Sequence, residues 1–125
     1  MSLVLGQKIV FERTFVAADV TQFTAVSQDE GVHHVTPDEH GRLVVHGLLT
    51  ATLPTKVGGA HDVLARTMLF EFVRPVYSGD TIRCEVEIVE LGQDEKQRTQ
   101  LKATFVCQNQ HEKTVLSGYF EGVIL

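Results

Sequence analysis

The chain has 125 residues, enough for one folded domain with its own core, and we expect residues 1–125 to form that single domain. Hydrophobic residues make up 43% and charged residues 22%, as in ordinary globular proteins. The net charge of −5 disfavours a nucleic-acid partner, because no basic stripe is available to neutralise phosphates. No apolar run approaches the roughly 20 residues that cross a membrane, and no signal-peptide pattern is present, so we expect a soluble, cytoplasmic protein.

The first expected elements are a strand over residues 7–14 and a helix over residues 17–26. In this helix Val20, Phe23 and Val26 recur at helical spacing, and Asp19 lies in the first turn, where the helix dipole favours a carboxylate. Residues 27–45 follow as a polar loop without strong periodicity. Loops of this length are uncommon in compact domains and are usually functional or partly mobile.

Residues 47–57 form an almost wholly apolar or small segment that ends at Gly58-Gly59, which we interpret as a helix stop. Because the segment has no polar face, it is expected to be a helix buried on all sides. Pro54 removes one helical hydrogen bond and frees the carbonyl of Thr50, so a kink or an early end is expected there.

From residue 63 onward the hydrophobic period changes to two, which predicts strands around residues 64–73, 82–88, 101–107 and 114–124. Short turns between the last three require antiparallel pairing. One buried helix and a sheet with one apolar face predict an α+β fold in which a curved antiparallel sheet wraps around the helix. Cys84 and Cys107 fall on apolar strand faces and are expected to be buried free thiols, with a disulfide as the alternative.

Asp29 and His34 lie five residues apart in the polar loop, shortly before the apolar helix opens at His46-Gly47. A carboxylate can take a proton from water, and an imidazole can hold or relay that proton. Free N–H groups at a helix start can stabilise a developing oxyanion. This constellation is the one part of the sequence that indicates chemistry.

Three motifs resemble the MaoC-like dehydratases and (R)-specific enoyl-CoA hydratases, which have the hotdog fold. Their Ser-Gly-Asp-x-Asn-Pro-Ile/Leu-His motif is similar to residues 27–34, and their His-Gly-Met/Leu-Leu motif is similar to residues 46–49. A third, Phe-x-Arg-Pro-Val-x-x-Gly-Asp-Thr, is similar to residues 72–81. The departures lie in the first motif, where Gln28, Gly31, Val32 and His33 replace Gly, Asn, Pro and an aliphatic residue.

The resemblance implies hydration of a trans-2-enoyl thioester, with Asp29 and His34 as the catalytic pair and no cofactor. It implies that the N–H of Gly47 stabilises the enolate-like oxygen and that Thr55 helps through a bound water. His46 is a candidate for substrate contact, with a structural contact at the helix entrance as the alternative. The expected partners are an acyl-CoA or acyl carrier protein thioester and a second copy of the chain, as a homodimer or larger homo-oligomer.

Other functions are also compatible with parts of the sequence. A metal site from His33, His34 and His40 is disfavoured, because no thiolate set or helical pair of histidines supports it. A hotdog thioesterase would generally carry a carboxylate on the central helix, and no acidic residue lies between Gly47 and Gly59. A non-catalytic acyl-thioester-binding module stays open because of the unusual Gly31-Val32-His33 stretch. An anionic substrate would need a local basic patch, for which Lys56, Arg66 and Arg74 are candidates.

Overall fold

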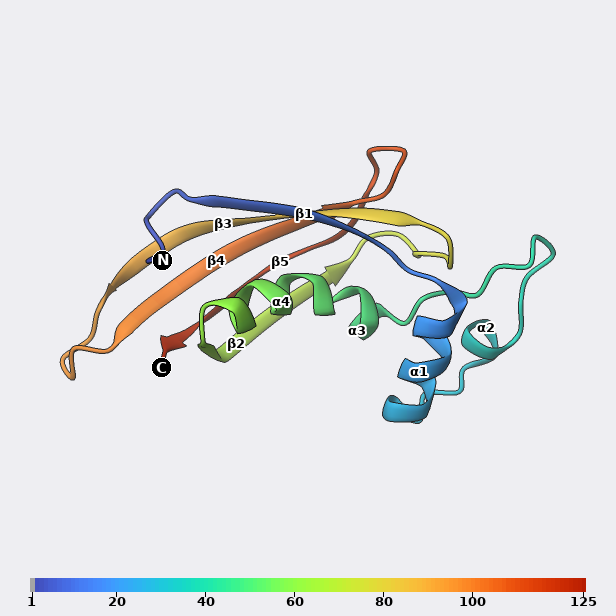
Figure 1. Ribbon diagram of the computed structural model, residues 1–125, viewed down its shortest axis with the longest axis horizontal. Helices are drawn as coiled ribbons and strands as arrows, with labels where there is room; N and C mark the ends of the chain where they lie inside the picture. The colour runs from blue at the N-terminus through green and yellow to red at the C-terminus, as the bar shows by residue number, and fades with distance from the viewer. Residues whose placement is uncertain (1) are drawn as a thin grey trace.

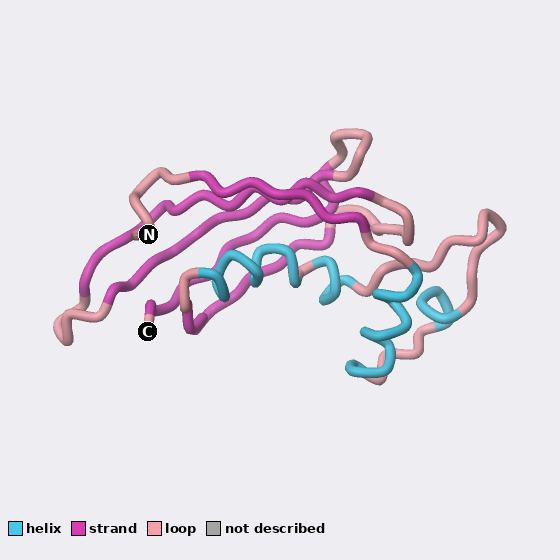
Figure 2. The backbone as a smooth tube through the Cα atoms, viewed as in Figure 1, coloured by secondary structure: helices cyan, strands magenta, loops and turns pink. Residues whose placement is uncertain are grey.

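A computed structural model describes residues 2–125 of the chain, as one sheet with helices under it and at one end (Figures 1 and 2). Helices α3 and α4 run along the concave side of the sheet, and α1 and α2 lie beyond its end. The elements in chain order are β1 (Lys8–Thr14), α1 (Ala17–Ser27), α2 (Val32–Val35), α3 (Gly47–Thr50), α4 (Thr52–Ala60), β2 (Val63–Phe72), β3 (Thr81–Gln93), β4 (Thr99–Gln108) and β5 (Thr114–Ile124). The structure therefore confirms the predicted strands and the helix after the first strand.

The sheet has five strands in the order β1-β3-β4-β5-β2, and every neighbouring pair is antiparallel. The three consecutive strands β3, β4 and β5 are side by side, as their short connections predicted. The edge strands β1 and β2 both precede the three central strands in the chain. One face of β3 and β4 is fully buried, and its residues include Ile82, Val86, Ile88, Ala103 and Phe105.

The central helix has the interruption that Pro54 predicted but differs from the prediction in two other respects. It is interrupted at Ala51, three residues before Pro54, because the proline ring conflicts with the carbonyl of the residue four positions earlier, Thr50. It continues to Ala60, so Gly58-Gly59 lies inside α4 and is not the helix stop. The segment is also not buried on all sides, since Leu48 is 60% exposed and Thr55 lies at the surface.

The predicted loop over residues 27–45 contains the short helix α2, which the sequence did not reveal. A helix of four residues is little longer than one turn, so it produces no recognisable hydrophobic period. In α1, Val20 is fully buried but Val26 is 82% exposed. The helical spacing of the apolar residues therefore identified the helix correctly but not the face that is buried.

Cys84 and Cys107 are free and buried, as predicted, and they face each other across β3 and β4. A hydrogen bond between the two thiols, and then burial, raises the pKa of Cys107 far above its ordinary range. Both thiols are inaccessible to solvent. Among residues 2–125, no helix is long and apolar enough to cross a membrane.

Candidate active site

The first site residue, Asp29, is positioned by the turn that ends α1. Gln28 adopts a left-handed conformation (φ 59°), which reverses the chain directly before Asp29. The N–H of Asp29 donates to Ser27 Oγ at 3.1 Å, and Asp29 Oδ1 accepts the N–H of Gly31 at 3.1 Å. These local bonds hold the carboxylate, which remains about half exposed, on the side of α2.

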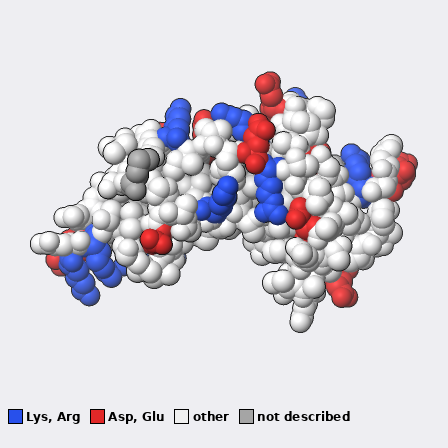
Figure 3. Space-filling model, in the orientation of Figure 1, with Lys and Arg blue, Asp and Glu red and all other residues white. Residues whose placement is uncertain are grey.

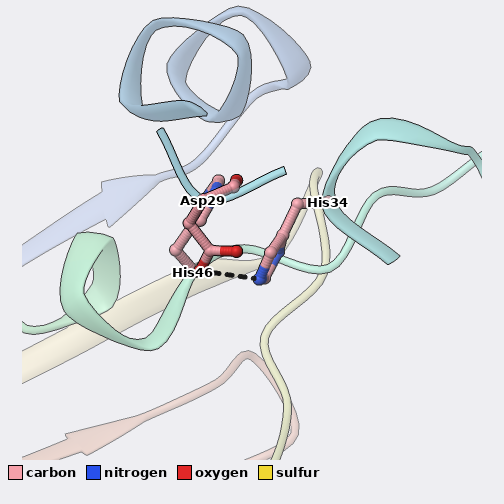
Figure 4. A group of neighbouring side chains, drawn as sticks. All are labelled: Asp29, His34 and His46. Carbon is pink, nitrogen blue, oxygen red and sulfur yellow. Dashed lines mark hydrogen bonds and ion pairs between the residues drawn. The ribbon is translucent and has the colours of Figure 1, made fainter. Parts of the chain in front are cut away.

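His34 is the buried residue of α2 and faces Asp29. Its Nδ1 donates to the carbonyl of Val44 at 2.6 Å, so the other ring nitrogen, Nε2, is left toward the carboxylate. Nε2 lies 3.7 Å from Asp29 Oδ2, slightly beyond a hydrogen bond (Figure 4). A backbone bond from Val44 N–H to the carbonyl of His33 ties the same loop to α2. The predicted pair is therefore brought together, at a separation that lets one water oxygen beside the two atoms contact both.

His46 lies beneath this pair and is 1% exposed. Its Nε2 donates to the backbone carbonyl of Asp29 at 3.1 Å, so it connects the residue before α3 to the segment after α1. Its ring is stacked on that of His34, with centroids 3.7 Å apart and an interplanar angle of 15°. The buried Nδ1 of His46 has no hydrogen-bond partner among the described residues. His46 thus supports both members of the pair.

Gly47 follows as the first residue of α3, and its N–H donates to no acceptor within residues 2–125. It borders a cleft of about 370 Å³ together with His34, Thr50 and Phe72. The ring of Phe72 covers Gly47 so closely that a Cβ at this position would lie 2.8 Å from the ring. The close contact with Phe72 explains why glycine stands here.

Among the predicted site residues, only His34 and Gly47 line this cleft, and Asp29 and His46 lie behind it in contact with His34. Thr55 lies away from the whole group. Its hydroxyl donates to the carbonyl of Thr52 at 2.7 Å. It borders a separate cavity of about 110 Å³, which also contacts Met68 and Phe120. Thr55 is on the next helix, α4, and the break at Ala51 separates the two helical segments.

The cleft also contains residues outside the predicted catalytic pair, among them Arg74, which the sequence indicated only as a candidate for a basic patch. His33, Phe72 and Arg74 line it, and within its lining no aspartate or glutamate is found. The signal for Phe72 and Arg74 was present, because both belong to the third motif, but nothing showed that this motif meets α3. A larger surface hollow of about 450 Å³ lies across β2 to β5. None of the predicted catalytic residues borders it, but Arg66, one candidate for a basic patch, does.

Asp29, His34 and His46 each offer one potential metal-ligand atom, and these atoms lie within 4.8 Å of one another. The two imidazole rings are nearly parallel and stacked, so their in-plane lone pairs lie in different planes. One metal ion could be bound by a ring nitrogen of both histidines only if one of the rings rotated. The arrangement suits the binding and transfer of a proton better than it suits a metal ion.

Comparisons with known proteins identify the relatives of this chain. A family model described as the Thioesterase superfamily matches residues 47–94. A curated (R)-specific enoyl-CoA hydratase from Aeromonas caviae is 33% identical over an alignment of 104 residues, and the match covers 74% of this chain and 76% of the relative. The solved (R)-hydratase from A. caviae involved in PHA biosynthesis matches with a TM-score of 0.86 at 28% identity, covering 99% of this chain and 98% of that one. An unliganded R-hydratase from Pseudomonas aeruginosa matches with a TM-score of 0.82 at 24% identity, covering 95% and 80%.

The antiparallel sheet curved around α3 and α4, with the site at the start of α3, defines a hotdog-fold protein. The predicted fold is therefore confirmed. Given one third identity over three quarters of both sequences, the chain belongs to the family of the (R)-specific enoyl-CoA hydratases and MaoC-like dehydratases.

Proposed function

We propose that this chain catalyses the reversible hydration of a trans-2-enoyl-CoA to an (R)-3-hydroxyacyl-CoA. The observation that carries the proposal is the pair of Asp29 and His34, 3.7 Å apart beside a cleft that also contains the free N–H of Gly47. Family membership supports the same reaction, because the A. caviae relative is an (R)-specific enoyl-CoA hydratase.

In the proposed mechanism a water molecule lies to one side of the pair and bridges Asp29 Oδ2 and His34 Nε2. The gap of 3.7 Å is too long for a direct hydrogen bond, and both groups are oriented to accept or hold a proton. As the water oxygen attacks the β-carbon of the enoyl group, Asp29 and His34 take up its proton and return a proton to the α-carbon. The backbone N–H of Gly47 stabilises the charge that builds on the thioester oxygen.

His46 and Thr55 have subsidiary roles in this proposal. His46 holds the backbone of Asp29 and supports the ring of His34, and both contacts are consistent with a positioning role. The family resemblance implies that Thr55 helps the reaction through a bound water. Such a water would have to connect the cavity beside α4, where Thr55 lies, to the cleft at Gly47. The position of its hydroxyl, bonded to Thr52, gives this assignment less support than the others.

The charges of the cleft support a substrate that carries an anionic group. In a chain of net charge −5, the cleft lining contains Arg74 and two histidines but no carboxylate. Arg74 donates to the carbonyl of Thr114, and its guanidinium forms no ion pair with a described carboxylate. Coenzyme A and the phosphopantetheine arm of an acyl carrier protein both provide phosphates that this group could contact. We propose the CoA thioester as substrate.

We also propose that the chain functions as a homodimer formed along β2. This strand is at the edge of the sheet and exposes apolar side chains that a soluble monomer would ordinarily cover: Leu64, Met68, Leu69 and Phe72. Phe72 belongs both to this edge and to the cleft, so pairing would close the site at one side. The cytoplasmic location expected from the sequence stays a prediction that cell fractionation can check.

Thioester hydrolysis is the main alternative, since the matched family model is named for thioesterases. α3 and α4 contain no aspartate or glutamate to activate water there, which favours hydration over hydrolysis. A purely binding role would leave the convergence of Asp29 and His34 without a use.

The decisive experiment follows the absorbance of the conjugated enoyl thioester with crotonyl-CoA. Wild type should hydrate it, and Asp29→Asn and His34→Ala should each lose about a hundredfold or more in kcat while remaining folded. His111→Ala, which changes an exposed histidine in the loop between β4 and β5, is the matched control and should retain activity. Release of free thiol would indicate a thioesterase, and binding without turnover would indicate a binding module; either result would overturn the proposal.

A further inference from the structure

Three imidazole rings form a continuous row at the site. The rings of His33 and His34 have centroids 3.9 Å apart at an interplanar angle of 50°, and the next contact joins His34 to His46 at 3.7 Å. His46 and His34 are buried, whereas His33 is exposed and borders the cleft. His34 is therefore covered on one face by a histidine that solvent reaches.

The position of His33 depends on Gly31. A Cβ at residue 31 would lie 3.0 Å from Cε1 of His33 and 3.3 Å from Cδ2 of His34. The missing side chain of Gly31 thus leaves the space that the ring of His33 occupies. The backbone of His33 is also fixed, because its carbonyl accepts the N–H of Val44, whose own carbonyl accepts Nδ1 of His34. The contact between the two rings is held from both sides.

We infer that His33 is a positioning residue of the proposed reaction, and that its positive charge, when present, opposes the uptake of a proton by His34. This inference rests on the proposed hydration and goes beyond the pair that was assigned to it. Asp29 is the acidic group beside His34, and Arg74 is the further cationic group bordering the same cleft as His33. His46, on the opposite face of His34, completes the titratable groups around that ring.

The sign of the effect follows from the mechanism. His34 must accept a proton at Nε2 while water attacks, and a second positive charge about 4 Å away makes this acceptance less favourable. The same charge makes the carboxylate of Asp29 a weaker base. Hydration by wild type should therefore slow as the medium is made acidic over about pH 8 to pH 5.5, the interval in which imidazoles ordinarily gain a proton.

The test is the pH profile of kcat with crotonyl-CoA for two variants that fix the charge of residue 33. His33→Gln cannot become positive. The factor by which its kcat falls between about pH 8 and pH 5.5 should be about tenfold smaller than the factor for wild type. His33→Lys stays positive and should show a low kcat over this whole range, with little change in KM. His111→Gln is the control, because it removes an exposed imidazole remote from the row and should keep the wild-type profile.

Gly31→Ala gives a second check that leaves the imidazole in place. It is read from the shape of the pH profile and not from the size of kcat, because the added methyl group would also lie 3.3 Å from His34 Cδ2 and 3.4 Å from Asp29 Oδ1. The added methyl group would push the ring of His33 off His34, so the profile should move toward that of His33→Gln. Circular dichroism establishes that each variant is folded. If His33→Gln and His33→Lys both keep the wild-type profile, the inference is wrong although hydration stands. If wild type does not hydrate the substrate, the proposed function itself has failed.

Discussion

At the residue scale, two positions show how the backbone of the site is built. Gln28 occupies a left-handed conformation that non-glycine residues adopt at a cost of about 1–2 kcal/mol. The motif that the sequence resembles has glycine at this place, and the structure gives the reason, because the turn at residue 28 aims Asp29 at His34.

We predict that Gln28→Gly stabilises the fold by about 0.5–1 kcal/mol, because glycine relieves this strain but loses more backbone entropy on folding. The measurement is the free energy of unfolding from urea titrations. Gln22→Gly, the same change at an exposed position inside α1, is the control and should destabilise by about 1 kcal/mol. Equal effects of the two changes would contradict the prediction.

Gly47 is the second such position, where the ring of Phe72 leaves no space for a side chain. We predict that Gly47→Ala lowers kcat by about tenfold or more, because the methyl group and the ring of Phe72 cannot occupy the same space and the oxyanion donor moves. Phe72→Leu combined with Gly47→Ala should recover part of this loss. Steady-state kinetics of both single variants and the double variant form the cycle, and strict additivity would refute the steric explanation.

At the scale of elements, one loop design is used three times. Residues 38–42, 94–98 and 109–113 each begin with an Asp or Asn whose Oδ1 accepts the N–H groups two and four residues later. The fourth residue of each loop has a positive φ. In the first two loops the arginine at the fifth position also donates its Nε to the aspartate.

These contacts make stability depend on pH through Asp94. Desolvation raises the pKa of Asp94, but hydrogen bonds from Arg98, Gln100 and Lys96 outweigh it and hold the pKa far below its ordinary value. In Asp38, bonds from the N–H of Arg42 and other groups also lower the pKa. A carboxyl whose pKa is depressed in the folded state stabilises the fold at pH values above its pKa in the unfolded state, about 3.9. This stabilisation is lost as the pH falls toward the pKa of the carboxyl in the folded state.

We therefore predict that Asp94→Asn reduces the acid sensitivity of the fold. The amide keeps both backbone bonds, as Asn109 does in the third loop, but carries no charge to titrate. Thermal unfolding at several pH values between about 5 and 2 should show a smaller fall in Tm for Asp94→Asn than for wild type. Glu95→Gln, at the exposed neighbouring residue, should behave like wild type.

At the scale of the whole molecule, the apolar edge at β2 indicates an interaction surface, whereas the charge distribution does not. Acidic and basic side chains are interspersed over the face seen in Figure 3, and no continuous basic stripe crosses it. The β2 edge exposes four large apolar side chains, whereas the exposed residues of the β1 edge include Lys8, Glu12 and Arg13. This asymmetry selects β2 for pairing between copies.

We predict that Leu69→Lys, on β2, converts the protein from dimer to monomer in sedimentation velocity. Val106→Lys is the matched control, because Val106 is 40% exposed against 38% for Leu69 but lies on the interior strand β4. It should leave the dimer intact. A monomeric wild type, or equal dissociation by both changes, would refute pairing through β2.

The sequence by itself determined the strands, the central apolar segment and the pair of Asp29 and His34, because hydrophobic period and local motifs depend on neighbours in the chain. Pro54 also predicted the interruption of the central helix. The sequence did not determine α2, the exposed face of α4 or the separation of Thr55 from the cleft. Those features depend on which surfaces meet in space. The sequence also did not predict the contact of Phe72 with Gly47 or that of the His33 ring with the His34 ring. Both contacts depend on how the folded backbone places these side chains.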